Sequence, residues 1–454
     1  MAVMETATAR PASTESTAPW LAEHERFLRE LPAGGPAAVQ VLRQLGIERF
    51  AGLGFPTLRQ EDWRFTNVAP IARGSFVRPQ SDPEAADPER LAVLDFPAAA
   101  RLVFVDGRFS AKLSQSSELP AGTVVASLAE VLANNPDQVL PWLGQLARVG
   151  EHPFVALNTA FLRDGACVLI PRGAVIGKPV HLLFLSSASS AGEATFSFPR
   201  NLIVTGENSQ VTLVETYAGE GAYLCCPVTE LVAGPASVID HYKLQRESRE
   251  AFHLATFQIE GERSSRPSSH SISIGGALVR NDVNAVLAGE GIDCILNGLY
   301  LAEGRQLIDN HMRVDHVKAH CASHELYKGI LDGKARAVFN GLIHVHPGAQ
   351  KTDAKQSNRN LLLSSEAIAN SNPQLEIFAD DVKCTHGSTV GQLDDDAIFY
   401  LRSRGIGEEA ARSLLTYAFA SDIVERIKLA PVRRDLEEFL FSRLPQGEVV
   451  RQAV

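Results

Sequence analysis

The stretches Leu202-Ile203-Val204-Thr205 and Val211-Thr212-Leu213-Val214-Glu215-Thr216 decide the fold class. Both are short, rich in β-branched residues and separated by a segment with Gly and Asn. Similar runs recur through residues 152–393 at a spacing of roughly 8–12 residues, almost without helical periodicity. A β-sandwich of this length would need about twice the usual number of strands. A β-solenoid can add any number of coils, because each coil contacts only its neighbours. We therefore predict a mainly β protein with a parallel β-helix core over residues 152–393.

Helical patterns follow the β-rich zone, over residues 394–454. Asp394 to Asp396 place carboxylates at a helix start, where they cap free N–H groups and suit the helix dipole. Gly405 is a natural helix end, Glu408 opens a second helix and Pro431 a third. These amphipathic helices either cap the solenoid or dock a partner, and the sequence leaves both roles open.

The region before the β-rich zone has two parts. Residues 20–151 mix helical pattern with loops, and Trp20 to Leu28 carry apolar residues at near-helical spacing. Residues 1–19 are rich in Ala, Thr and Ser and lack the apolar core of a signal peptide. We predict an N-terminal helical or mixed domain over 20–151. For residues 1–19 we favour a disordered tail over an organelle-targeting peptide.

Composition limits the function classes. The net charge of −10 and the lack of a Lys/Arg cluster argue against a dedicated nucleic-acid binder. No apolar run is long enough for a membrane span. The six cysteines form no C-x-x-C pair and no small disulfide framework. These features predict a cytoplasmic protein in a reducing compartment.

The common catalytic motifs are missing. There is neither a P-loop nor a G-x-G-x-x-G fingerprint, so the chain should not hydrolyse ATP by itself. There is also no G-x-S-x-G nucleophile elbow. We therefore predict no catalytic residues.

Cys384 and His386 form the strongest candidate metal pair. On a strand, residues i and i+2 point to the same face, so the two side chains would project together. Thiolate and imidazole are ligands that iron, zinc or copper could use. The alternative is a buried cysteine beside a hydrogen-bonded histidine. The position at the end of the β zone favours an interface, and two ligands alone leave any metal under-coordinated.

Five further histidines are weaker metal candidates. On one continuous strand, His316, His320 and His324 would have the same parity and could share a face. His344 and His346 also share parity. The alternative, which we favour, is that all five are polar solenoid positions hydrogen-bonded to neighbouring coils.

The C-terminal segments Asp381–Gly391 and Phe399–Ile406 have a specific sequence. They resemble the SufD branch of the SufB/SufD family, which belongs to the SUF iron–sulfur cluster assembly machinery, and they carry the most specific likeness. Asp309–Gly329 also looks similar, as does Pro56-Thr57 followed by Glu61-Asp62-Trp63-Arg64. The resemblance covers nearly the whole chain.

The resemblance implies a right-handed parallel β-helix flanked by N-terminal and C-terminal helical domains. It implies a non-catalytic scaffold that pairs with the paralogue SufB through the β-helix, or with itself when isolated. It also implies that the C-terminal helices bind the ATPase SufC. Cys384 and His386 match the family positions proposed to contribute ligands to iron or a transient iron–sulfur cluster at the SufB interface.

Three alternatives remain open at this stage. The chain could be the SufB paralogue, although the Cys-x-His pair argues for SufD. It could be a β-helix carbohydrate-active enzyme such as a polysaccharide lyase, but those enzymes are typically secreted. It could be a hexapeptide-repeat acyltransferase, since Ile170–Gly177 mimics one repeat, but no regular array follows.

Overall fold

The computed structural model describes residues 14–31, 35–80, 82–85, 96–117, 119–189 and 191–453. Its centre is a parallel β-solenoid built from two sheets, which confirms the predicted fold class. Sheet 1 contains, in spatial order, β2 (Arg108–Ser116), β1 (Ala100–Val105), β5 (Val180–Ser187), β8 (Gln210–Glu220), β11 (Val238–Arg246), β13 (Arg266–Ser273), β15 (Asp293–Ala302), β17 (Ala322–Leu331), β19 (Asp353–Leu362) and β21 (Lys383–Gly391). Sheet 2 contains β20 (Ile368–Ile377), β18 (Arg336–Val345), β16 (Leu307–His316), β14 (Leu278–Leu287), β12 (Phe252–Gly261), β10 (Val228–Ala233), β7 (Arg200–Thr205), β4 (Ala166–Ile170) and β3 (Val124–Ser127), with β6 (Thr195–Ser197) and β9 (Tyr223–Cys225) beside this path.

From β11 onward the chain alternates between the two sheets, so that two strands make one coil. The coils differ in length: Val238 pairs with Arg266, Asp293 with Ala322, and Ala322 in turn with Asp353. This variation explains why the sequence shows no fixed repeat, although every coil has the same architecture.

The interior of the solenoid is the main hydrophobic core. Inward-facing residues of successive coils stack, as Ala285, Val314 and Ile343 do in sheet 2, and all three are fully buried. Burial of such rows removes apolar surface from water at about 25 cal/mol per Å². Successive side chains of each β-rich run point alternately into the solenoid and out of it.

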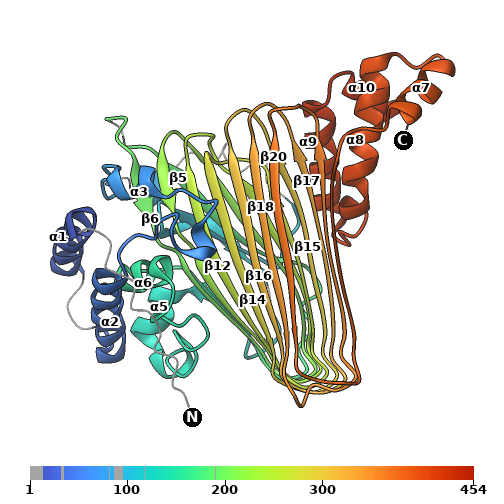
Figure 1. Ribbon diagram of the computed structural model, residues 1–454. Coiled ribbons are helices and arrows are strands. Elements are labelled where there is room, and N and C mark those ends of the chain that lie inside the picture. The colour runs from blue at the N-terminus through green and yellow to red at the C-terminus, as the bar shows by residue number, and fades with distance from the viewer. Residues whose placement is uncertain are drawn as a thin grey trace, which may run out of the picture.

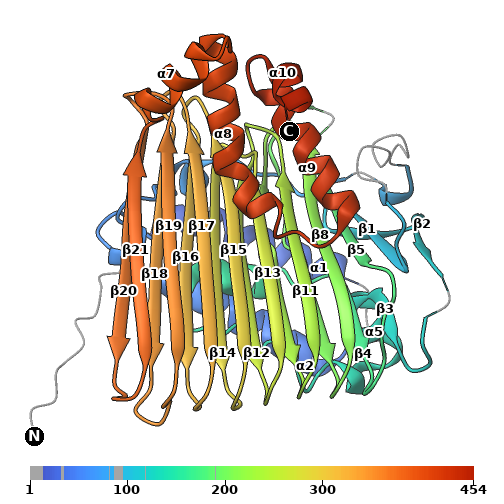
Figure 2. The same cartoon turned by 90° about the vertical axis from the view of Figure 1, so that its right-hand side faces the viewer.

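The C-terminal helices lie on the outer face of sheet 1, as Figures 1 and 2 show. They are α7 (Asp395–Ser403), α8 (Glu408–Val424), α9 (Ala430–Arg443) and α10 (Gly447–Ala453). Asp394 caps α7 by accepting hydrogen bonds from the backbone N–H groups of Asp396 (2.9 Å) and Ala397 (3.4 Å). Gly405 has φ 88° and Glu408 begins α8, so the predicted helix signals are confirmed.

The N-terminal helices lie on the opposite side of the solenoid (Figure 1), against sheet 2. They comprise α1 (Thr14–Glu30), α2 (Ala37–Leu53), α3 (Ala69–Arg73), α5 (Leu128–Asn134) and α6 (Pro153–Ala160), with the short 3₁₀ turns η1 (Glu61–Trp63), η2 (Pro83–Ala85) and η3 (Pro136–Gln138). Aromatic residues such as Trp20 and Phe161 pack together and meet Leu254 and Leu278 of the solenoid. The helices therefore share a core with the sheet.

Three predicted boundaries need correction. Helix α1 begins at Thr14, so residues 14–19 are helical, and the rest of the predicted tail lies outside the described residues. The predicted β range contains α6, which is buried along its whole length and therefore lacks an amphipathic pattern. The predicted N-terminal domain contains β1 to β3, which extend the solenoid sheets. Among the described helices, none has both the length and the apolar character needed to cross a bilayer.

Candidate functional site

The solenoid ends at β20 and β21, which are the last strands of their sheets. Within the described ranges no strand pairs with their outer edges. Side chains here are unusually exposed, including Phe378 at 59% and Val390 at 48%. Free backbone edges combined with exposed apolar side chains characterise a surface that another chain covers. We call this surface, residues 368–391, the open end.

Cys384 and His386 both lie on β21. In the register of sheet 1, Ala354 of β19 pairs with Cys384, and Gln356 pairs with His386. Ala354 and Gln356 are buried inside the solenoid. The two candidate ligands therefore continue the inward-facing rows of sheet 1 at the end of the solenoid. Cys384 is half-buried there and His386 is exposed.

The surroundings of Cys384 favour the protonated thiol. Burial raises its pKa, and the nearby Asp353 carboxylate adds to this effect. A metal that used Cys384 as a ligand would have to displace the thiol proton. In the part of the chain that the structure describes, the groups of three metal-ligand side chains lie elsewhere, so this pair offers two donors only.

A polar row leads from the interior to His386. Glu325 of β17 pairs in register with Gln356, and Gln356 Nε2 donates a 2.8 Å hydrogen bond to Glu325 Oε2. Burial raises the pKa of Glu325 to about 7, while the Gln356 hydrogen bond opposes the shift. Gly341 makes room for this row, because a Cβ there would lie 2.4 Å from Gln356 Nε2.

His316, His320 and His324 do not lie on one continuous strand, so the condition under which they could share a face is not met. His316 ends β16 in sheet 2, and its Nε2 lies 2.9 Å from Ser323 Oγ. His320 sits in the following turn with φ 60°, and His324 belongs to β17 in sheet 1. The turn over residues 317–321 separates the three rings because it carries the chain from one sheet to the other.

His344 and His346 do come together, with ring centroids 4.5 Å apart. The structure adds Asp315, which sequence reasoning missed because it lies one coil earlier. A second cluster, also missed, is buried within the solenoid and contains Cys225, Glu247 and His253. No local spacing in the sequence could have completed either set, since Asp315 lies one coil before the two histidines and Cys225, Glu247 and His253 come from three separate segments.

The Glu61-Asp62-Trp63-Arg64 segment joins the N-terminal helices to the solenoid. The Arg280 guanidinium of β14 stacks 3.7 Å from the centre of the Trp63 ring. It also donates hydrogen bonds to the Asp62 carbonyl (2.7 Å) and to Asp309 Oδ2 (2.9 Å). The segment therefore has a structural role in this chain.

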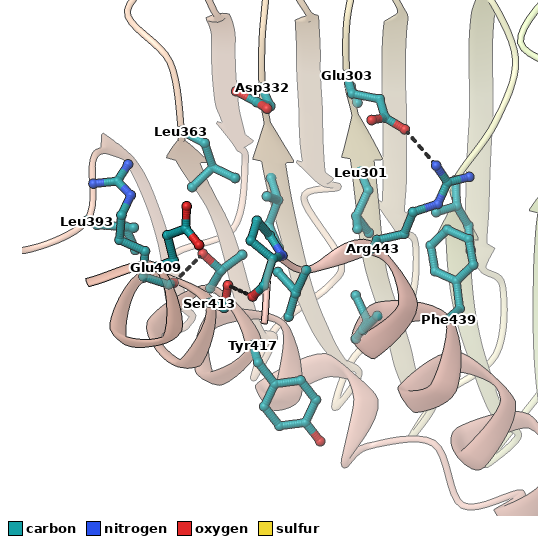
Figure 3. A pocket seen from close by; sticks show the side chains of 18 of the residues that line it. Leu301, Glu303, Asp332, Leu363, Leu393, Glu409, Ser413, Tyr417, Phe439 and Arg443 are labelled. Carbon is teal, nitrogen blue, oxygen red and sulfur yellow. Dashed lines mark hydrogen bonds and ion pairs between the residues drawn. The ribbon is translucent and has the colours of Figure 1, made fainter. Parts of the chain in front are cut away.

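A cleft of about 340 Å³ separates the C-terminal helices from the upper part of sheet 1, as Figure 3 shows. Leu301 and Leu363 line its sheet side, and Tyr417 and Phe439 line its helix side. One rim carries the ion pair between Arg443 Nη1 and Glu303 Oε1, at 3.4 Å. Away from this cleft, α8 and α9 pack directly against apolar residues of sheet 1.

Comparison with known families identifies the chain. Residues 186–419 match the model described as "SUF system FeS cluster assembly, SufBD core domain". Residues 24–182 match the SufBD protein N-terminal region. The chain belongs to the SufBD family of the SUF system. The predicted resemblance is confirmed.

Several curated members of the SufBD family are similar over most of their length. An iron–sulfur cluster assembly SufBD family protein of Synechocystis is 35% identical, with 88% of this chain and 90% of the relative covered. The iron–sulfur cluster assembly protein SufD of Escherichia coli is 32% identical, covering 96% and 99%. The SufD protein of Bacillus subtilis is 26% identical, covering 88% and 93%. The chain therefore belongs to iron–sulfur cluster assembly rather than to the carbohydrate-active or acyltransferase classes.

Proposed function

We propose that this chain is the SufD-type scaffold subunit of an iron–sulfur cluster assembly complex. It is non-catalytic, pairs with a SufB-type paralogue through the open end, and binds a SufC-type ATPase through its C-terminal helices. The full-length similarity to two proteins named SufD supports the assignment to this branch. The observation that carries the proposal is the open end itself, where free strand edges, exposed apolar side chains and a Cys–His pair coincide.

Hydrogen-bond directions favour β21 as the strand that pairs with the partner. In β20 the N–H groups of even-numbered residues face β18, because the N–H groups of Ile368 and Phe378 donate to β18 and its flanking segment. The N–H groups of odd-numbered residues therefore face the free edge of β20. Pro373 is one of these residues, and proline has no backbone N–H to donate. In β21, Lys383 N donates to Thr352 O (2.8 Å), so the N–H of Ser388 faces outward. The edge of sheet 1 keeps its outward donors, while that of sheet 2 lacks one.

Cys384 and His386 supply two ligands to iron or to a nascent cluster, which is the cargo of the complex, and the partner subunit supplies the rest. A thiol whose pKa is raised by burial binds metal with loss of a proton and regains that proton on release. Such a ligand suits a cluster that must later leave. The parallel pairing of β17, β19 and β21 holds Glu325, Gln356 and His386 in a fixed register.

The C-terminal helices offer a second docking surface. On α7, Phe399 is 72% exposed and Tyr400 is 56% exposed, and Arg404 lies 5.1 Å from the Tyr400 ring centre. Aromatic side chains with an adjacent arginine are typical of residues that dominate binding energy at interfaces. Helices α8 and α9 pack largely against sheet 1, and of the other two helices α7 exposes the aromatic side chains, so we assign ATPase binding to α7. All six cysteines are free thiols, which fits function in the reducing cytoplasm.

The proposal is tested by reconstituting the complex with SufB-type and SufC-type partners under anaerobic conditions. Cys384→Ser and His386→Ala should leave the complex assembled but reduce cluster yield by about tenfold or more, the scale of a lost metal ligand or ligand support. His324→Ala, on the outer face of sheet 1, is the matched control and should behave as the native chain. Normal cluster yield in both site variants would refute the assignment, and so would failure of the native chain to bind the paralogue.

A further inference from the structure

A second candidate metal site lies on the outer face of sheet 2, next to the open end, with its three ligand residues outside residues 368–391. Asp315 of β16 pairs in register with His344 of β18, and His344 pairs with Glu376 of β20. His346 follows directly after β18. Three successive coils thus place these side chains in one row, although they are distant in sequence.

The geometry brings three donor atoms together. One ligand atom each from Asp315, His344 and His346 lies within 4.8 Å of the other two. His346 Nε2 is 3.4 Å from Asp315 Oδ1, and the two imidazole rings are 4.5 Å apart. The side chains are 14%, 18% and 39% exposed, so an ion can reach them from solvent. Two imidazoles with one carboxylate form the donor set that proteins use for Fe²⁺ and related divalent ions.

Outer partners hold two of the three donors in place. His344 Nδ1 lies 2.8 Å from Glu376 Oε2, the carboxylate contact that metal-bound histidines commonly make. Arg313 Nε and Nη2 bond to both oxygens of Asp315, at 2.7 and 2.8 Å. Although burial opposes it, the Arg313 hydrogen bond and charge lower the pKa of Asp315, which keeps the carboxylate ionised.

We propose that Asp315, His344 and His346 bind a divalent first-row transition metal ion, with Glu376 and Arg313 as supporting residues. The site is complete within one chain, unlike the Cys384–His386 pair, and needs no partner subunit. It contains no sulfur ligand, so its spectroscopic signature differs from that of a thiolate site. The competing explanation is a pair of histidine–carboxylate ion pairs that bind no metal.

The test is a titration of the metal-free full-length chain with Co²⁺ under anaerobic conditions, followed by absorption spectroscopy, with Zn²⁺ calorimetry and Fe²⁺ binding in parallel. We expect one equivalent of Co²⁺ with d–d bands and no thiolate charge-transfer band. The double variant His344→Gln with His346→Gln should abolish Co²⁺ binding. Glu376→Gln should weaken the Co²⁺ affinity by about tenfold or more. Thermal unfolding of the metal-free variants shows whether they remain folded.

Two controls make the result decisive. His320→Asn removes an exposed histidine from a turn, and asparagine tolerates its φ of 60°. Cys384→Ser removes the other candidate site, and both controls should leave Co²⁺ binding unchanged. The proposal fails if the native chain binds no Co²⁺, if the double variant binds it normally, or if the bound ion shows thiolate charge transfer that Cys384→Ser removes. None of these outcomes affects the reconstitution test of the open end.

Discussion

We expect the stability of the fold to depend on the ionisation of Glu325. It is buried in the solenoid, and burial raises its pKa from 4.5 to about 7. The folded state therefore keeps the proton over a pH range in which the unfolded state has already released it. Stability falls as pH rises from about 4.5 to about 7, and then levels off.

Glu325→Gln should remove this pH dependence. The amide cannot ionise, and its oxygen can still accept the hydrogen bond from Gln356. At pH 8 the variant should be more stable than the native chain by up to a value on the order of 3 kcal/mol. At pH 4.5 and below the two should be nearly equal. Thermal unfolding at both pH values measures the difference.

Glu366→Gln is the matched control for this prediction. Glu366 is exposed and pairs with Lys334 on the surface, where ion pairs contribute little. Its replacement should shift the unfolding temperature equally little at both pH values. A similar small effect for Glu325→Gln would show that the Glu325 carboxyl is solvated in solution.

At the scale of single elements, α7 carries the prediction for the ATPase. Phe399→Ser with Tyr400→Ser removes two exposed aromatic side chains without opening a core. We expect binding of the SufC-type subunit to weaken by at least about 2 kcal/mol, a typical interface hot-spot loss, while pairing with the paralogue persists. Calorimetry or pull-down with each partner separately measures both effects.

This double substitution is a more specific test of the docking surface than deletion of all the C-terminal helices. Deletion of α8 and α9 would expose Leu299, Ile330 and other apolar residues on the outer face of sheet 1. Loss of partner binding would then follow from unfolding alone. Val449→Ser is the control, because Val449 is also an exposed apolar residue on a C-terminal helix, α10. Unchanged ATPase binding in the α7 variant would exclude this helix as the docking surface.

The elements also show what sequence can predict. The cap of α7 at Asp394, its end near Gly405 and the start of α8 at Glu408 were predictable, because helix ends depend on adjacent residues. The solenoid was predictable from its β-branched runs. The buried helix α6 was not, since its apolar sequence has no polar face to reveal the helical period.

Candidate site residues could be grouped from the sequence only where they share a strand. Cys384 and His386 both lie on β21, as their grouping by parity required, and their role stays a proposal. The row of Asp315, His344 and Glu376 depends on how three coils of unequal length align. The lengths of the coils set that register, and no local sequence pattern reveals those lengths. For the same reason the turn after His316 separated histidines that parity alone had grouped together.

At the scale of the whole molecule, no described element covers the open end of the solenoid, while helices cover part of each outer face. The N-terminal helices lie against part of sheet 2 and the C-terminal helices against part of sheet 1, as Figures 1 and 2 show. An unpaired parallel sheet edge tends to recruit further strands. We therefore expect the isolated chain to form homodimers through the open end, and a SufB-type partner to displace them.

Ser388→Pro tests this arrangement because it changes only the outward edge of β21. The Ser388 N–H faces away from β19, so proline removes a donor to a partner and no bond within the chain. The variant should remain folded but lose both self-association and pairing with the paralogue, as measured by light scattering after size-exclusion chromatography. Ser371→Pro is the matched control on β20, where Pro373 already interrupts the outward donors, and it should pair normally. If Ser371→Pro abolished pairing and Ser388→Pro did not, the partner would bind along β20 of sheet 2. The Cys384–His386 pair would then lie outside the interface between the subunits.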